Sequence, residues 1–205
     1  MRLSRLLFVA ALLFTATGLQ AAFAQAEAPD ALVKRVSSDV LDAVRADPTI
    51  QPGNVGRVVE LVDAKILPSF DFERMTASAV GPRWNDATPA QKASLQAQFK
   101  ILLVRAYAGA LAQARDRTLE IQPLRSGSTD PQVVVKTIVK GGREPVGLDF
   151  RLFNEGAAWK ITDVNVGGLW LVENYRGNFA QEIASGGIDG LIGKLSDRNK
   201  STAGR

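Results

Sequence analysis

The sequence predicts an α+β domain in which a curved antiparallel sheet of four strands is covered on one face by helices. Three observations support this class. Apolar residues recur at helical spacing from residue 30 to about residue 115, and helical spacing returns after residue 167. Between these regions, apolar and polar positions alternate, and short links rich in glycine, serine and asparagine divide the runs. Helices, then a meander of strands, then helices again form the element order of an α+β domain.

Two amphipathic helices are predicted at residues 30–45 and 55–67. Valines recur every three or four positions in both segments, and charged residues fill the other faces of the first. The proline-containing stretch 47–53 separates them. The second helix stops before Pro68, because the residue preceding a proline disfavours helical geometry.

A short helix and a long helix follow. Asp71 can cap the short one by accepting hydrogen bonds from its free amides, and Gly81 suits a left-handed terminating position. Thr88 can cap the long helix, Pro89 fits its first position, and Gln91 can bond back to the cap. The wide apolar face of this helix, which runs to about residue 115, consists of Leu95, Phe99, Leu102, Leu103, Ala106, Tyr107, Ala110 and Ala114.

The sheet is predicted as a meander with tight reversals at Ser126–Ser128, Gly141–Gly142 and Asn154–Gly156. The four expected strands are residues 118–124, 132–140, 144–153 and 158–166. One face is expected to be buried because alternate residues are apolar, namely Val133, Val135 and Val139 on the second strand and Val146, Leu148, Phe150 and Leu152 on the third. The opposite face keeps Asp149 and Arg151.

Two further helices are expected after the sheet, around residues 172–184 and 188–195. Paired glycines precede each of them, and both helices can cover the sheet. Residues 197–205 are polar and small, so we expect them to form a flexible tail.

The first 24 residues are expected to form a signal peptide. Two arginines precede an apolar run from Leu6 to Ala16, and Ala22-Phe23-Ala24 is an Ala-x-Ala cleavage site. An apolar core of about 11 residues is well short of the roughly 20 needed to span a bilayer, which favours a cleaved leader over an anchor. Cleavage would leave a domain at residues 25–196, followed by the tail.

The composition excludes several kinds of chemistry. The absence of cysteine excludes disulfides, thiolate metal sites and an acyl anchor on cysteine. The absence of histidine removes the usual general base at neutral pH and the usual zinc ligand. Without the two arginines of the leader, 23 basic and 21 acidic residues remain, and this formal charge of +2 does not predict nucleic-acid binding. About 181 residues suffice for one domain with a sizeable core.

Two carboxylate pairs could act as acid and base if burial raised the pKa of one member. These pairs are Asp149 with Asp163, and Asp71 with Glu73. The sequence favours a simpler interpretation, in which Asp71 caps a helix and Asp149 is solvated on the open face of the sheet.

Two segments carry the most specific pattern in the sequence. The first contains Phe70-Asp71-Phe72-Glu73-Arg74-Met75, Val80-Gly81, Trp84 and Thr88-Pro89, and extends to Tyr107. The second contains Leu171-Val172-Glu173-Asn174-Tyr175-Arg176, followed by Gly187-Ile188-Asp189-Gly190-Leu191-Ile192. In order and spacing they resemble the MlaC family, the periplasmic phospholipid-binding proteins of Gram-negative toluene-tolerance and lipid-asymmetry systems. The likeness covers nearly all of the chain after the leader.

The resemblance implies a periplasmic protein without catalytic residues, metal or cofactor, in which an apolar cleft between sheet and helices holds the acyl chains of a phospholipid. It also implies two partners, an inner-membrane ABC transporter with its substrate-binding ring and an outer-membrane lipoprotein complex, between which lipid moves to maintain outer-membrane asymmetry. Arg83, Arg105 and Arg176 are candidates to hold the headgroup by paired charged hydrogen bonds. The matching segments and the buried faces together give the lipid-contacting residues Phe72, Met75, Leu103, Tyr107, Val135, Leu148, Phe150, Val164, Val166, Tyr175 and Ile188.

Three other interpretations stay open. The hopanoid-associated branch of the same family would bind a polycyclic lipid instead of a diacyl one. A small cone-shaped isomerase or hydratase is also built from helices beside a curved sheet, and it would need a buried carboxylate. A structural adaptor would have a filled core and no ligand, since an aromatic residue on an apolar face is ordinarily core.

Overall fold

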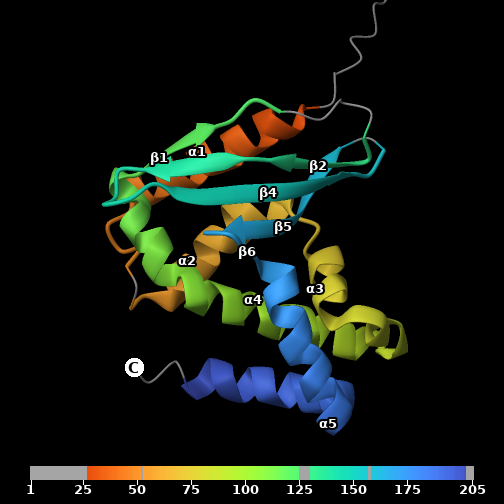
Figure 1. Ribbon diagram of the computed structural model, residues 1–205. Helices are drawn as coiled ribbons and strands as arrows, with labels where there is room; N and C mark the ends of the chain where they lie inside the picture. The colour runs from red at the N-terminus through yellow and green to blue at the C-terminus, as the bar shows by residue number, and fades with distance from the viewer. Residues whose placement is uncertain (1–26, 52, 125–129, 157, 202–205) are drawn as a thin grey trace, which may run out of the picture.

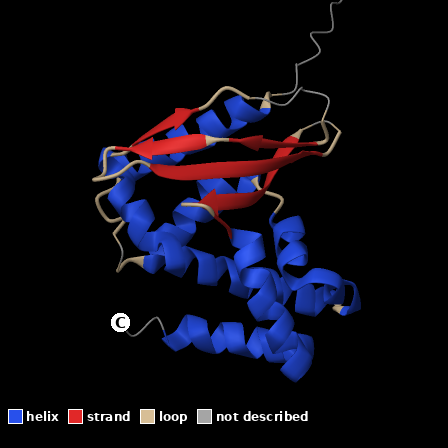
Figure 2. Cartoon of the chain, in the orientation of Figure 1, coloured by secondary structure: helices blue, strands red, loops and turns tan. Residues whose placement is uncertain are grey.

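The computed structural model describes residues 27–51, 53–124, 130–156 and 158–201, and it has the expected α+β fold. Figure 1 and Figure 2 show the strands gathered in one layer, with most of the helices packed below it in this view. The expected signal peptide at residues 1–24 and the expected reversal at Ser126–Ser128 lie outside the described residues.

The second expected helix changes its geometry before it ends. Helix α1 spans Pro29–Ala46 and α2 spans Val55–Leu61, followed by a π-helical turn at Val62–Ile66 and a 3₁₀ turn at Leu67–Ser69. The Leu67 N–H donates to the carbonyl of Val62, five residues back. Pro68 has no N–H to continue an α-helical pattern, so the chain leaves the helix through these two irregular turns.

The predicted caps of the next two helices are confirmed. Helix α3 spans Phe72–Val80 and continues into a 3₁₀ turn at Gly81–Asp86, and α4 spans Pro89–Ala112 and continues into a 3₁₀ turn at Gln113–Asp116. Asp71 Oδ1 accepts a hydrogen bond of 2.8 Å from the Arg74 N–H, and Gly81 has a φ of 76°. The Gln91 N–H donates to Thr88 Oγ1 at 3.2 Å, while the Thr88 N–H donates to Gln91 Oε1 at 2.9 Å. Local sequence therefore determines where both helices begin.

The sheet has six strands instead of the four that the sequence predicts. They are β1 (Thr118–Ile121), β2 (Gln132–Val135), β3 (Thr137–Lys140), β4 (Val146–Asn154), β5 (Trp159–Val166) and β6 (Leu169–Trp170). All pairings are antiparallel in the order β1-β3-β4-β5-β6, and β2 pairs with β4 beyond the end of β3. The meander order is therefore right, and the number of strands is wrong.

Two local features account for the additional strands. The expected second strand is interrupted at Lys136, where the Thr137 N–H donates to Asp149 Oδ1 at 3.1 Å and the Thr137 hydroxyl donates to the carbonyl of Leu148. The side chains of Thr137 and Asp149 thus replace part of the backbone hydrogen bonding between the strands at this point. At the other edge, Gly167 and Gly168 have φ values of 60° and 97°, which suits a two-residue reversal that returns the chain to β5 as β6.

The two helices expected at the C-terminus form one element with a kink. Helix α5 spans Leu171–Ser201, and Gly187, with φ 67° and ψ −168°, interrupts its helical geometry. The flexible tail is predicted for residues 197–205, but Asp197 to Ser201 belong to the last part of helix α5. Asn199 is buried there and donates to the carbonyl of Gln98 at 2.9 Å, which ties the end of α5 to α4.

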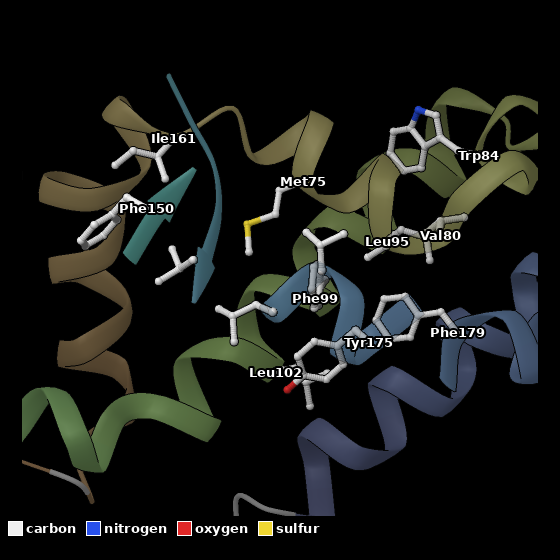
Figure 3. Packing of buried hydrophobic residues seen from close by; sticks show 14 of the residues in the cluster. Met75, Val80, Trp84, Leu95, Phe99, Leu102, Phe150, Ile161, Tyr175 and Phe179 are labelled. Carbon is white, nitrogen blue, oxygen red and sulfur yellow. The ribbon is translucent and has the colours of Figure 1, made fainter. Parts of the chain in front are cut away.

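The buried apolar residues form two separate groups. The main core joins the sheet to the N-terminal half of α1, to α3, to the first half of α4 and to α5, and it includes Phe99, which lies beside Tyr175 and Phe179 in Figure 3. The second core joins the C-terminal half of α1 to α2 and the middle of α4. Its buried members are Val40, Val44, Ile50, Val58, Leu61, Val104 and Ala108.

Candidate functional site

An apolar cavity of about 530 Å³ lies between the sheet and helices α1, α2 and α4. This volume falls within the range of small-molecule binding sites. Members of both the main core and the second core line the cavity. The space is thus enclosed by side chains that elsewhere belong to the hydrophobic cores.

The floor of the cavity is one face of the sheet. Strand β4 contributes Leu148 and Phe150, and β5 contributes Val164 and Val166. Leu148 lies opposite Val166 and Phe150 opposite Val164 in the antiparallel register, so all four side chains are on the same face. The alternation expected from the sequence therefore produces a continuous apolar surface.

The helices form the remaining walls. Met75 and Phe72 come from the start of α3, and Leu103 and Tyr107 come from successive turns of α4, four residues apart on one face. Burial raises the pKa of Tyr107, so its phenol stays neutral at physiological pH. Helix α1 and the segment from α2 to Phe70 complete the wall with Val36, Val40, Leu41, Val58, Val62, Ile66, Leu67 and Phe70.

The exposed residues of the cavity lining gather at one end. Among the lining residues that the structure describes, the exposed ones are Ala110, Gln113, Thr118, Gly142, Arg143, Glu144 and Val146. They belong to the end of α4 and the 3₁₀ turn after it, the start of β1, and the β3–β4 turn with the first residue of β4, which meet at the left of Figure 1. Away from this end, Met75 is 1% exposed. We therefore place the mouth of the cavity between the end of α4 and the β3–β4 turn.

Charged side chains in the lining are few. Lys100 Nζ forms an ion pair with Asp63 Oδ1 at 2.8 Å. Arg117, Arg143 and Glu144 are at the mouth, and within the described part of the chain none of the three has a hydrogen bond or ion pair from its side chain. The interior is apolar, and its charge is concentrated where the pocket meets solvent.

Eight of the eleven residues predicted to contact lipid line this cavity. They are Phe72, Met75, Leu103, Tyr107, Leu148, Phe150, Val164 and Val166. The structure thus brings together residues from α3, α4, β4 and β5 that are far apart in the sequence. Their contact with a ligand stays a prediction.

Val135, Tyr175 and Ile188 do not line the cavity and belong to the main core. The ring of Tyr175 lies 5.2 Å from that of Phe99 in an edge-to-face arrangement, and Val135 is 0% exposed. Figure 3 shows Tyr175 next to Phe99. The structure therefore places these three residues in the core and not in the wall of the cavity. Apolar periodicity identifies a buried face, but it does not show whether that face meets another side chain or an open space.

The three arginines expected at a headgroup also lie off the cavity. Arg83 pairs with Asp86 at 3.2 Å on the surface, and Arg176 Nε donates to the carbonyl of Ser78 at 3.0 Å. The Nε of Arg105 is buried without a partner among the described residues. The arginines that do border the cavity, Arg117 and Arg143, were missed, because only the position of the mouth distinguishes them from ordinary surface arginines.

The carboxylates considered for acid–base chemistry have structural roles. Asp149 is half-buried and therefore less solvated than expected, and its Oδ1 accepts a hydrogen bond from the Thr137 N–H. Asp163 accepts hydrogen bonds from the N–H groups of Val164 (2.8 Å) and Val172 (3.1 Å) and pairs with Arg151 at 3.2 Å. Burial raises the pKa of Asp163 in spite of these bonds. Asp163 therefore anchors the start of α5 to β5.

Asp149 and Asp163 also lie on the sheet face opposite the cavity, because they alternate with the residues of its floor. Asp71, the remaining candidate, caps α3 and pairs with Arg74. Within the described residues, no three carboxylates are grouped so that they could hold a metal ion.

The fold and the site define a small α+β protein with a ligand-sized apolar pocket. The MlaC protein family matches residues 34–197, in which all of the cavity-lining residues lie. The chain belongs to the MlaC family.

Two relatives support this assignment. The toluene tolerance protein ttg2D of Pseudomonas putida is 21% identical over 178 residues, which cover 83% of each chain. A solved structure of a phospholipid-binding protein from Ralstonia solanacearum, in complex with a phospholipid, is 43% identical to this chain, with a TM-score of 0.82, and the match covers 85% of this chain and 98% of that one. Among the helices that the structure describes, none has the length and apolar character needed to cross a membrane.

Proposed function

We propose that this protein binds a diacyl phospholipid in the periplasm and carries it between the outer and inner membranes. The observation that supports this most directly is the apolar pocket of about 530 Å³ with charged residues at its mouth. The Ralstonia relative, which has the same fold at 43% identity, was solved in complex with a phospholipid. Acyl chains would occupy the pocket and the headgroup would stay at the mouth.

Such a pocket meets the main energetic requirement of a lipid carrier. Each methylene kept out of water contributes about 0.8 kcal/mol, so two chains of about 16 carbons would cost roughly 20 kcal/mol to hold in water. A wall of Val, Leu, Phe and Met side chains offers the chains an environment close to that of the membrane. Because the contacts are apolar and non-directional, such a wall can accept chains of different length.

The described residues offer little support for catalysis in the pocket. Glu144 is the one carboxylate in the described lining, and it is exposed at the mouth. Asp149 and Asp163, which a cone-shaped isomerase or hydratase could use, face the other side of the sheet and hold backbone amides. We infer that the protein acts as a carrier and not as an enzyme.

The partners we propose are an inner-membrane ABC transporter with its substrate-binding ring and an outer-membrane lipoprotein complex. Membership of the MlaC family and the relation to a toluene tolerance protein support this assignment. In this function the carrier would contribute to the lipid asymmetry of the outer membrane. The expected signal peptide would deliver it to the periplasm.

Mass spectrometry of the protein purified from the periplasm, first native and then denatured, tests the proposal. We expect a stoichiometric adduct that is released on denaturation and identified as a diacyl phospholipid. A polycyclic hopanoid would place the protein in the other branch of the family. Reproducible absence of any lipid from a compact, stable protein would contradict the carrier function.

A further inference from the structure

Two guanidinium groups at the mouth of the cavity have no role in holding acyl chains. Arg117 follows the 3₁₀ turn after α4, and Arg143 lies in the turn between β3 and β4. In the part of the chain that the structure describes, neither guanidinium group has an ion pair or a hydrogen bond. Most other arginines of the described chain form at least one such contact, for example Arg83 with Asp86.

The backbone of the β3–β4 turn makes room for one of these groups. A Cβ atom added at Gly142 would lie 3.0 Å from Cζ and 3.3 Å from Nη2 of Arg117, which is tighter than ordinary contact. The guanidinium group of Arg117 therefore lies against the Gly142 backbone, next to Arg143 in the chain. Arg117 is half-buried and Arg143 is exposed, so Arg117 lies nearer to the pocket and Arg143 nearer to solvent.

A diacyl ligand whose chains fill the apolar interior leaves its polar group at this mouth, because burying a phosphate without hydrogen-bond partners is strongly unfavourable. A guanidinium group binds a phosphate through two parallel charged hydrogen bonds. Counting Glu144 with the two arginines gives the unpaired groups of the mouth a net charge of +1, which matches a single phosphodiester.

We propose that Arg117 and Arg143 hold the phosphate of the bound lipid and make the pocket selective for phospholipids over neutral diacyl lipids. This inference rests on the proposed function and adds a recognition element to it. The acyl chains supply the affinity common to both lipid classes, and the arginines supply the difference between them.

The test compares two fluorescent lipids with identical acyl chains, a phosphatidylglycerol and a diacylglycerol, each delivered from methyl-β-cyclodextrin to delipidated protein. The variants are Arg117→Gln and Arg143→Gln. Arg83→Gln is the matched control, because Arg83 is an exposed arginine away from the cavity. Circular dichroism and thermal melting check that every variant is folded.

We expect each mouth variant to bind phosphatidylglycerol about tenfold more weakly and diacylglycerol unchanged. Arg117→Lys should restore part of the loss, because it keeps the charge without the paired hydrogen bonds. Gly142→Ala should reduce phosphatidylglycerol binding while leaving both charges in place, because it displaces the Arg117 guanidinium group.

Equal effects of the mouth variants on the two lipids, or no effect on either, would overturn this inference and leave the carrier function intact. If the wild type captures neither lipid, the proposed function itself fails, and the inference fails with it.

Discussion

Replacing Leu148 by glutamate puts an ionisable group on the floor of the cavity. Leu148 is half-buried, lines the pocket and lies opposite Val166 in the register of β4 and β5. In the empty pocket, water entering through the mouth can reach the new carboxylate, so we expect the protein to fold. An acyl chain above it would remove that water.

The size of the expected loss of affinity depends on the protonation state of the new carboxyl group when lipid is bound. The least unfavourable bound state has the carboxyl group protonated, and for a glutamate with an ordinary pKa of about 4.3 this costs about 3.7 kcal/mol at pH 7, or roughly a 500-fold loss of affinity. At pH 5 protonating this carboxyl group costs about 1 kcal/mol. We therefore expect the variant to bind lipid roughly 100-fold more tightly at pH 5 than at pH 7. The predicted signature is therefore a loss of binding that reverses in mild acid.

The assay is the capture of a fluorescent phospholipid by delipidated protein, measured between pH 5 and pH 7. Leu148→Gln is one control, because it adds polarity without a titratable group and should bind with little dependence on pH. Val134→Glu is the second control, because Val134 lies opposite Arg151 on β4, on the face away from the cavity. Binding by Leu148→Glu that equals the wild type at pH 7, or that is lost equally at both pH values, would refute the placement of Leu148 against the lipid.

Three further predictions concern stability, each measured by urea unfolding. Thr88→Ala removes the capping box of α4 and should lower the free energy of unfolding by about 1 kcal/mol; an unchanged midpoint would show that the cap is redundant. Asp163→Ala should cost about 2–3 kcal/mol, because the Val172 N–H loses its buried acceptor, and a loss below 0.5 kcal/mol would contradict its role as an anchor. Hydrogen bonds from Thr49 and Arg57 lower the pKa of Asp47 from 3.8 to about 2, so its contribution to stability is present above pH 3.8 and is lost as the pH falls towards 2. Asp47→Asn should remove that part of the acid dependence, and identical acid profiles for the two proteins would exclude it.

The sequence predicted the elements whose signals are local. Asp71, Thr88 and Gln91 identify two helix starts because a cap needs only a side chain and the amides of the next turn. The alternation of apolar and polar residues, which predicts that Leu148 and Phe150 share a buried face, is equally local, because successive side chains of a strand point to opposite faces. These features were sufficient to give the fold class and most of the cavity floor.

The sequence was less informative where long-range contacts compete with local pattern. The interruption at Lys136 depends on Asp149, a residue of the neighbouring strand, which replaces part of the regular pairing. The continuation of α5 beyond Asp197 depends on Asn199, which bonds to Gln98 about a hundred residues earlier. Asp149 lies 12 residues from Thr137 and Gln98 lies 101 residues from Asn199, beyond the reach of the local patterns that predict caps and alternation.

The sequence by itself determined the α+β fold, the helix caps and which face of the sheet is apolar. Only the tertiary structure decided that Leu148 faces an open cavity while Tyr175 packs against Phe99, and that Arg117 and Arg143 stand at the mouth. The physical reason is that a core and an apolar pocket both exclude water and therefore favour the same residues. Whether two buried surfaces meet or leave a space depends on how closely distant elements approach, and here a cavity of about 530 Å³ remains between the sheet and helices α1, α2 and α4.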